Sequence, residues 1–347
     1  MVSLYILVLL LLIVFGSKIT IWNDSYIDKQ HTTTLNGMFI ILVFLSHANG
    51  YIHLTDYTDF GTRIYNFLFT AVGQMMVVMF FFYSGYGLMT QFHARKHEYV
   101  LSFFKSRILK TWLHFIVALI PFGIINLLLG YRFGLNTWLL SLTGFESIGN
   151  SNWYIFDVLC LYLLFYFVIY ISDKKNVSQL NCCIAITALT IVLWFVIRTL
   201  KGSKRWWYDT ILAFPAGCFY AFEKANIERK VRSSRITYFV VMSVVFCLFC
   251  SFYIRRNPYT VSLSSVFFAL FVVGTTYIFD IRSTILNWLG NRLFFIYIFQ
   301  RLPMIALSYF GIDNKPMVFI FLSFVLTIAI TLVMERVYFY LDKTLRL

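Results

Sequence analysis

Apolar runs long enough to cross a lipid bilayer recur along the whole chain and leave few folds open to it. A transmembrane helix needs roughly 20 mainly apolar residues, and a backbone inside a bilayer must satisfy its own hydrogen bonds. The sequence therefore predicts an all-α protein, a polytopic transmembrane helical bundle of about eleven spans. These lie near residues 2–22, 35–54, 67–89, 112–130, 153–172, 181–199, 208–223, 237–254, 261–279, 288–309 and 316–340.

The composition supports this fold class and excludes soluble ones. Hydrophobic residues make up 60% of the chain and charged residues only 13%. In soluble domains, about a quarter of all residues are charged. All six cysteines fall within apolar runs, and the Cys247 and Cys250 pair has no second pair or histidine nearby. We therefore predict neither a metal site nor a disulfide, and we exclude a soluble enzyme, a disordered chain and a small disulfide scaffold.

The loops between the apolar runs predict the orientation in the membrane. The net charge is +14, but the basic residues lie mostly in short loops, as the positive-inside rule predicts, and so do not indicate a nucleic-acid partner. The basic clusters at 95–110 and 224–235 place the N-terminus outside the plasma membrane and the C-terminus in the cytoplasm. One cluster falls outside under this topology and indicates either a loop that contacts something anionic or an error in the span count. It consists of Arg198, Lys201, Lys204 and Arg205.

The first apolar run has neither a basic start nor a small-residue cleavage site before Lys18. We therefore expect residues 1–30 to form a retained transmembrane anchor helix and its loop, not a cleaved signal peptide. Residues 31–347 are then one transmembrane domain, because no linker or repeat divides them.

His47 is the ionisable residue that stands out within the spans. Such a residue costs about 2.5–3.5 kcal/mol on insertion and is a functional candidate by default. His47 lies about thirteen residues into its span, which is ~20 Å deep. Imidazole suits proton transfer near neutral pH, although a histidine that only hydrogen-bonds a neighbouring helix fits equally well. Asn36, eleven residues earlier, lies within ~20° of the same helix face.

Other polar residues in the spans are candidates of the same kind. Arg301 lies at the depth of His47 and next to Gln300, so it either shares a cavity with His47 or extends to the interface. Asp157 lies behind Asn152, Trp153 and Tyr154 near the outer end of its span. Gln74 lies among methionines and valines and is expected to form an interhelical hydrogen bond.

Two further stretches have alternative interpretations. Ser84 and Gly85 are small residues inside an aromatic run and permit close approach of either a ligand or another helix. The segment 103–110 carries Lys105, Arg107 and Lys110. These residues either follow the positive-inside rule and contact lipid headgroups, or they hold the phosphates of a nucleotide-like donor.

Taken in order, these elements resemble the membrane acyltransferase-3 family, whose members acylate sugars and other acceptors with acyl-CoA. The resemblance extends from about residue 31 to the end of the chain, after an additional N-terminal helix. The family commonly has an arginine where this chain has Asn36, and often a histidine where it has Gln300. Lys105 or Arg107 is the alternative for the donor-activating role of that arginine. The resemblance is carried by Phe44-Leu45-Ser46-His47, the Phe-Phe-x-x-Ser-Gly stretch ending at Gly85, Lys105-x-Arg107, Asn152-Trp153-Tyr154, Leu289-Gly290-Asn291 and Phe295-Ile296-Tyr297.

The resemblance implies an O-acetyltransferase of capsule or exopolysaccharide sugars. Acetyl-CoA is then the donor cosubstrate, and the partners are a glycan or lipid-linked sugar, membrane lipids and polysaccharide-assembly proteins. The alternative is a transporter or flippase of such sugars without acyl transfer. The catalytic residues would be His47, Arg301 and Gln300; the donor-binding residues Ser84, Gly85, Lys105, Arg107 and Lys110; and the acceptor-binding residues Asn36, Asn152, Trp153, Tyr154 and Asp157.

Overall fold

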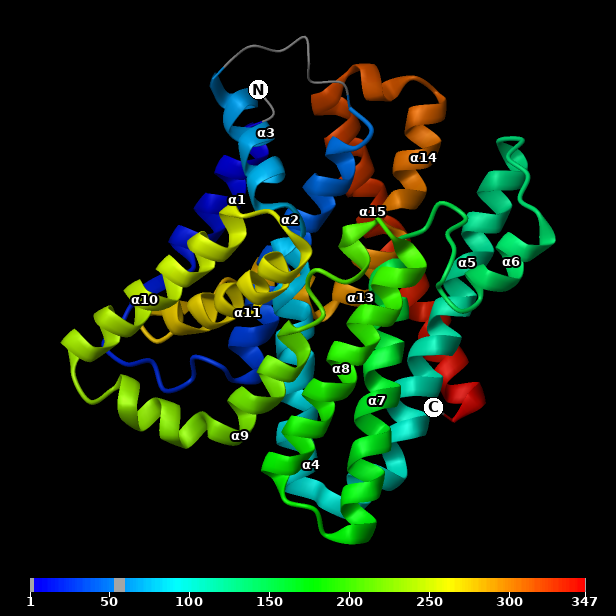
Figure 1. The fold of residues 1–347 in the computed structure, drawn as a ribbon. Helices are drawn as coiled ribbons and strands as arrows, with labels where there is room; N and C mark the ends of the chain where they lie inside the picture. The colour runs from blue at the N-terminus through cyan, green and yellow to red at the C-terminus, as the bar shows by residue number, and fades with distance from the viewer. Residues whose placement is uncertain (1–2, 53–59, 347) are drawn as a thin grey trace.

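The computed structural model describes residues 3–52 and 60–346, and these form a bundle of helices (Figure 1). The described residues also include one short antiparallel strand pair. The all-α membrane bundle predicted from the sequence is confirmed. Within the described ranges, six helical segments are long and apolar enough to cross a membrane. They are Gly73–Leu128, Trp153–Lys175, Gln179–Lys201, Arg235–Ile254, Pro258–Thr275 and Pro316–Leu345.

The first expected span is shorter than predicted. Helix α1 covers Ser3–Phe15, and the chain then forms strand β1 (Ser17–Ile19), which pairs antiparallel with β2 (Phe279–Ile281). Gly16 precedes the strand, and a side chain there would meet Ser283. The strand pair therefore joins the N-terminal segment to the late helices.

Two other expected spans are interrupted at identifiable residues. The run 67–89 is divided among α3 (Phe60–Val72), η1 (Gly73–Val77) and the start of α4 (Val78–Phe103), and Gly73 has a φ of +49°, a conformation that favours glycine. The run 288–309 is divided among α12 (Thr284–Asn291), α13 (Leu293–Phe299) and α14 (Arg301–Tyr309). Pro303 cannot donate to the carbonyl four residues earlier and clashes with it, which explains the break after Phe299.

Helix α4 turns back on itself near its end. Lys96 has non-helical angles within it (φ 44°, ψ −119°), and in Figure 1 the chain turns at the lower end of α4 and rises into α5 (Lys110–Leu128). The connecting segment η2 (Phe104–Leu109) is a π-helix. Phe103 stacks against Tyr166 of α7 (Trp153–Lys175), with ring centroids 5.9 Å apart. The turn therefore packs the basic segment 105–110 against α7.

Glycine pairs bring two pairs of helices into backbone contact. A Cβ atom at Gly37 of α2 (Lys29–Asn49) would overlap the Leu286 carbonyl of α12, and one at Gly290 would overlap a carbonyl of α2. Gly85 of α4 and Gly217 of α9 (Ala213–Val231) have the same reciprocal relation. Small residues allow this close approach, and it positions α2, the helix that carries His47.

The remaining elements complete the bundle. Polar side chains cap the N-termini of α2, α8, α10, α11 and α12, as stable helices prefer. Helix α10 buries only Tyr238, which fits a helix that faces lipid. The other elements are α6 (Leu135–Ser141), α8 (Gln179–Lys201), η3 (Arg205–Trp207), α10 (Arg235–Ile254), α11 (Pro258–Thr275), η4 (Ile312–Asn314) and α15 (Pro316–Leu345).

Candidate active site

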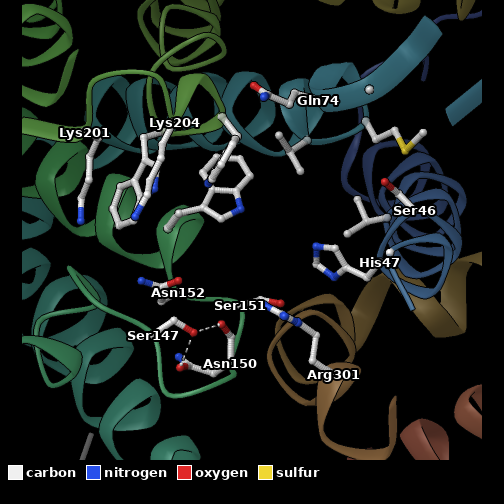
Figure 2. A pocket seen from close by; sticks show the side chains of 18 of the residues that line it. Ser46, His47, Gln74, Ser147, Asn150, Ser151, Asn152, Lys201, Lys204 and Arg301 are labelled. Carbon is white, nitrogen blue, oxygen red and sulfur yellow. Dashed lines mark hydrogen bonds between the residues drawn. The ribbon is translucent and has the colours of Figure 1, made fainter. Parts of the chain in front are cut away.

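A cavity of about 810 Å³ lies where the C-terminal end of α2 meets η1, the α6–α7 loop, the α8–α9 loop and the start of α14 (Figure 2). These five elements are far apart in the sequence, and each contributes a polar side chain to the lining. Among them are His47 of α2, Gln74 of η1, Asn152 of the α6–α7 loop, Lys204 of the α8–α9 loop and Arg301 of α14.

His47 presents one ring nitrogen to this cavity. Its Nδ1 is buried and has no hydrogen-bond partner among the residues that the structure describes. Because the side chain lines the cavity, Nε2 is the nitrogen that faces it. The ring lies 6.2 Å, between centroids, from that of Tyr297. The preceding turn of α2 is held by Tyr65, whose hydroxyl donates to the Leu45 carbonyl at 3.0 Å. The imidazole is thus positioned by packing, with a lone donor or acceptor available to a ligand.

Arg301 is the first residue of α14 and reaches the same part of the cavity as His47 (Figure 2). Its Nε contacts the Tyr51 hydroxyl at 3.3 Å, and its guanidinium carbon lies 5.9 Å from the centre of the Tyr51 ring. No ion pair to a carboxylate is formed by Arg301 within the described part of the chain. Its remaining N–H donors are therefore available to an anionic group, or to a negative charge that develops during a reaction.

The α6–α7 loop forms a wall with unused hydrogen-bond donors. Ser147 donates to the Asn150 carbonyl at 2.8 Å, and the Asn152 amide donates to the Gly144 carbonyl at 2.7 Å. These bonds hold the loop in place. Asn150 and Ser151 are 0% and 2% exposed, yet the Asn150 Nδ2 and Ser151 Oγ atoms find no partner within residues 3–52 and 60–346. Both residues line the cavity.

The opposite wall is basic and aromatic. Lys201 is buried; its Nζ donates to the Phe145 carbonyl at 2.6 Å and lies 3.3 Å from the Glu146 carboxylate. Lys204 is exposed and lines the cavity together with Trp206 and Trp207. Aromatic faces of this kind offer large, amphipathic contact areas to a ligand.

The structure brings together four of the residues predicted from the sequence: His47, Arg301, Asn152 and Trp153 all line the cavity. Gln300 does not line it, because its side chain turns inward and donates to the Tyr297 carbonyl at 3.0 Å. Its catalytic role stays a prediction.

Three predicted acceptor-binding residues, Tyr154, Asp157 and Asn36, are not in the cavity lining. Tyr154 packs against Tyr297, with ring centroids 5.1 Å apart. Asp157 is fully buried, and neither carboxyl oxygen has a hydrogen-bond partner in the described ranges. Asn36 likewise has a buried, unpartnered Oδ1, about 16 Å from His47 along the axis of α2. Asn36 and Asp157 therefore retain hydrogen-bonding capacity outside the cavity lining.

The predicted donor-binding residues lie away from the cavity. Ser84 and the Tyr162 hydroxyl are 2.9 Å apart, and Gly85 is at the contact between α4 and α9. Lys105 and Arg107 are exposed on η2, while Lys110 is 2.7 Å from the Asp342 carboxylate. The structure therefore separates the basic segment from the cavity that contains His47.

Several lining residues were not identified from the sequence, among them Ser46, Asn150, Ser151 and Trp206. Gln74 was expected to form an interhelical hydrogen bond; instead it lines the cavity, and its Oε1 has no partner among the described residues. Lys204 was visible only as part of a basic cluster at odds with the positive-inside rule.

In the described part of the chain, no group of three or more His, Cys, Asp or Glu side chains is arranged to hold a metal ion. The six cysteines are free.

Comparison with known proteins identifies the family. Residues 34–336 match the model of an acyltransferase domain, the family named acyltransferase 3. No curated protein and no solved structure matches the chain. The family match covers most of the chain, and the helices that it covers include spans long enough to cross a membrane. The chain therefore belongs to the membrane acyltransferase-3 family and is a multi-pass membrane acyltransferase.

Proposed function

We propose that this protein is an O-acetyltransferase of the plasma membrane that moves an acetyl group from acetyl-CoA to a hydroxyl of a capsule or exopolysaccharide sugar. The observation that carries the proposal is His47, whose Nε2 faces a polar cavity next to Arg301. The family supplies the class of reaction, and the cavity supplies a base beside a cation.

His47 would act as general base. Its Nε2 accepts the proton of the acceptor hydroxyl while the alcohol oxygen bonds to the acyl carbon; the carbon–sulfur bond then breaks, and the proton passes to the thiolate. A positioned base of this kind typically accelerates a reaction 10²–10⁴-fold. Arg301 would donate hydrogen bonds to the oxygen on which negative charge develops. Its contact with the Tyr51 hydroxyl holds the guanidinium in position for this role.

The acceptor sugar would bind at the cavity wall made by Trp153, Trp206 and Trp207. Sugar rings pack on aromatic faces, and their hydroxyls need hydrogen-bond partners. Asn150 and Ser151 are buried polar residues with unused donors in the described chain, so they suit this purpose. The predicted contribution of Asn152 and Trp153 to acceptor binding is consistent with their place in the cavity lining.

Acetyl-CoA would supply an activated thioester, and the residues present fit it. Phe104 of η2 lies 5.9 Å from Tyr166 of α7, while Trp153, at the start of α7, lines the cavity. The distance from Trp153 to Tyr166 along the helix is ~20 Å, comparable to an extended pantetheine arm. Lys105 and Arg107, both exposed on η2, would bind the phosphates from the cytoplasmic side.

Buried polar groups of α4, α7 and α13 support that assignment. The hydroxyls of Tyr83 and Tyr297 and the carboxyl of Asp157 are buried and lack partners among the described residues. Unmade hydrogen bonds of buried groups are costly, and the amides of a pantetheine arm would satisfy them. Lys110 has Asp342 as its partner, so we assign the phosphates to the other two cations.

Substitution of His47 tests the proposal. We expect His47→Ala to lower O-acetylation of surface glycan at least 10²-fold, at unchanged abundance in the membrane. His93→Ala, which removes an exposed histidine of α4, is the control and should retain activity. Wild-type O-acetylation by His47→Ala would refute the assignment. A purified protein that moves a lipid-linked sugar across vesicles without releasing CoA from acetyl-CoA would favour the flippase alternative.

A further inference from the structure

The cavity has a feature that acyl transfer to a neutral sugar does not require, namely the cation of Lys204, which has no carboxylate partner among the described residues. We infer that the acceptor is an anionic glycan, one that carries a carboxylate or phosphate group, and that Lys204 binds this group. The inference rests on the proposed function and specifies the substrate class of the same site.

Lys204 stands out within the basic cluster of the α8–α9 region. Under the expected topology this cluster lies on the outer side, where an excess of Lys and Arg is unusual. Three of its four members have partners inside the fold: Arg198 packs over Trp194 and Tyr259, Lys201 bonds to Phe145 and Glu146, and Arg205 pairs with Asp209 and bonds to the Arg256 carbonyl. Lys204 forms no side-chain hydrogen bond or ion pair with any residue that the structure describes, and it lines the cavity.

The residues that line the cavity carry a net positive charge. Lys201, Lys204 and Arg301 line the cavity, and Glu146 is the carboxylate among the described lining residues. Glu146 lies 3.3 Å from Lys201, so this pair neutralises itself. Lys204 and Arg301 are left without a carboxylate partner in the described ranges. If Arg301 donates hydrogen bonds to the oxygen of the reacting carbonyl, Lys204 is available to pair with a negative charge on the acceptor.

The α6–α7 loop adds hydrogen-bond donors to the cavity lining. Asn150 Nδ2 and Ser151 Oγ are buried and unpartnered within the described residues, and Figure 2 shows Ser151 between Asn150 and Arg301. Carboxylate and phosphate oxygens accept hydrogen bonds and donate none. Sugar hydroxyls can use Asn150 and Ser151 as partners, but they carry no charge that would balance Lys204. An anionic group on the acceptor supplies that charge and also accepts hydrogen bonds from these donors.

The test measures the recognition of the acceptor's charge by Lys204. The acceptor is the surface glycan of cells that lack the gene, used intact, after reduction of its carboxyl groups, or after removal of its phosphates. Transfer from radiolabelled acetyl-CoA is followed with the purified protein. An exposed ion pair is worth at most about 1 kcal/mol, so we expect Lys204→Gln to raise the KM for intact glycan about fivefold and to leave the KM for acetyl-CoA unchanged.

Chemical removal of the anion should have the same effect on the wild type. It should also abolish the difference between the wild type and Lys204→Gln, and the treatment that does so identifies carboxylate or phosphate as the recognised group. Lys204→Arg should retain wild-type KM. Lys315→Gln removes another exposed charge, next to η4 at the start of α15, and should have no effect.

Failure of the inference can be distinguished from failure of the proposed function. If both treated glycans are acetylated with wild-type KM, or if Lys204→Gln leaves the KM for intact glycan unchanged, the acceptor is not recognised by its charge and the proposed O-acetylation stands. If the wild-type protein acetylates no form of the glycan and releases no CoA, the proposed function itself fails.

Discussion

The close contact of α4 and α9 at Gly85 leads to a sharp prediction about a residue that the family resemblance assigns to the donor site. A Cβ atom at Gly85 would overlap the Phe214 carbonyl oxygen and lie 3.3 Å from the Cys218 nitrogen. Both are backbone atoms, so no side-chain rotation relieves the clash. Gly87 lies two residues further along α4, and a Cβ atom there meets nothing within 4 Å. Gly87→Ala is therefore a matched control on the same helix.

The two substitutions should change stability in opposite directions. Replacement of a helical glycine by alanine stabilises the helix by roughly 1 kcal/mol. Overpacking costs typically about 1–3 kcal/mol, and the upper part of this range applies to Gly85 because the overlap is with backbone. We expect Gly85→Ala to lower the free energy of unfolding by about 1–2 kcal/mol, the difference of the two terms. Gly87→Ala should raise it by up to about 1 kcal/mol.

Thermal unfolding of the purified protein in detergent measures this contrast, with loss of the monodisperse fraction as the signal. The apparent melting temperature of Gly85→Ala should lie below that of the wild type, and that of Gly87→Ala should equal or exceed it. The reasoning is refuted if Gly85→Ala is as stable as Gly87→Ala. If, in addition, it binds acetyl-CoA more weakly, Gly85 contacts the donor and does not set the helix spacing.

Two further predictions concern the donor site and the charged residue beside His47. The double substitution Lys105→Ala with Arg107→Ala should raise the KM for acetyl-CoA about tenfold, because two charge-assisted contacts to phosphate are lost. Lys175→Ala, which removes an exposed lysine at the end of α7, is the control. An unchanged KM for acetyl-CoA in the double variant would remove η2 from the donor site. Arg301→Lys keeps the charge but loses the planar fork, and we expect kcat to fall about 10–10²-fold with the KM for acetyl-CoA unchanged, as for the loss of a transition-state hydrogen bond. Full kcat in Arg301→Lys would argue for a charge that only binds ligand.

Residues that are neighbours in the sequence show why the site required the tertiary structure. The side chains of two successive residues such as Gln300 and Arg301 point in directions ~100° apart around a helix axis. The sequence predicted that both would lie near His47. The rotation of the helices within the bundle decided that Arg301 faces the cavity and that Gln300 is buried against Tyr297. This rotation depends on contacts with other helices, which local periodicity does not specify.

The sequence by itself determined the fold class, the membrane location and His47 as the central candidate. These follow from properties of short segments, because the length and apolarity of a run decide whether it can cross a bilayer, and an imidazole in such a run is conspicuous. The family resemblance, which depends on short motifs, could also be recognised from the sequence and is confirmed by the match over residues 34–336.

Only the tertiary structure decided which polar residues share a cavity with His47. Asn150, Ser151 and Lys204 come from loops whose positions depend on helices elsewhere in the chain, and Arg301 is 254 residues from His47 in the sequence. The breaks at Gly73 and before Arg301 set the directions of η1 and α14. Backbone contacts at glycines set the spacing of α2 and α12. Such long-range packing arises from the simultaneous fit of many side chains, and no single segment encodes it.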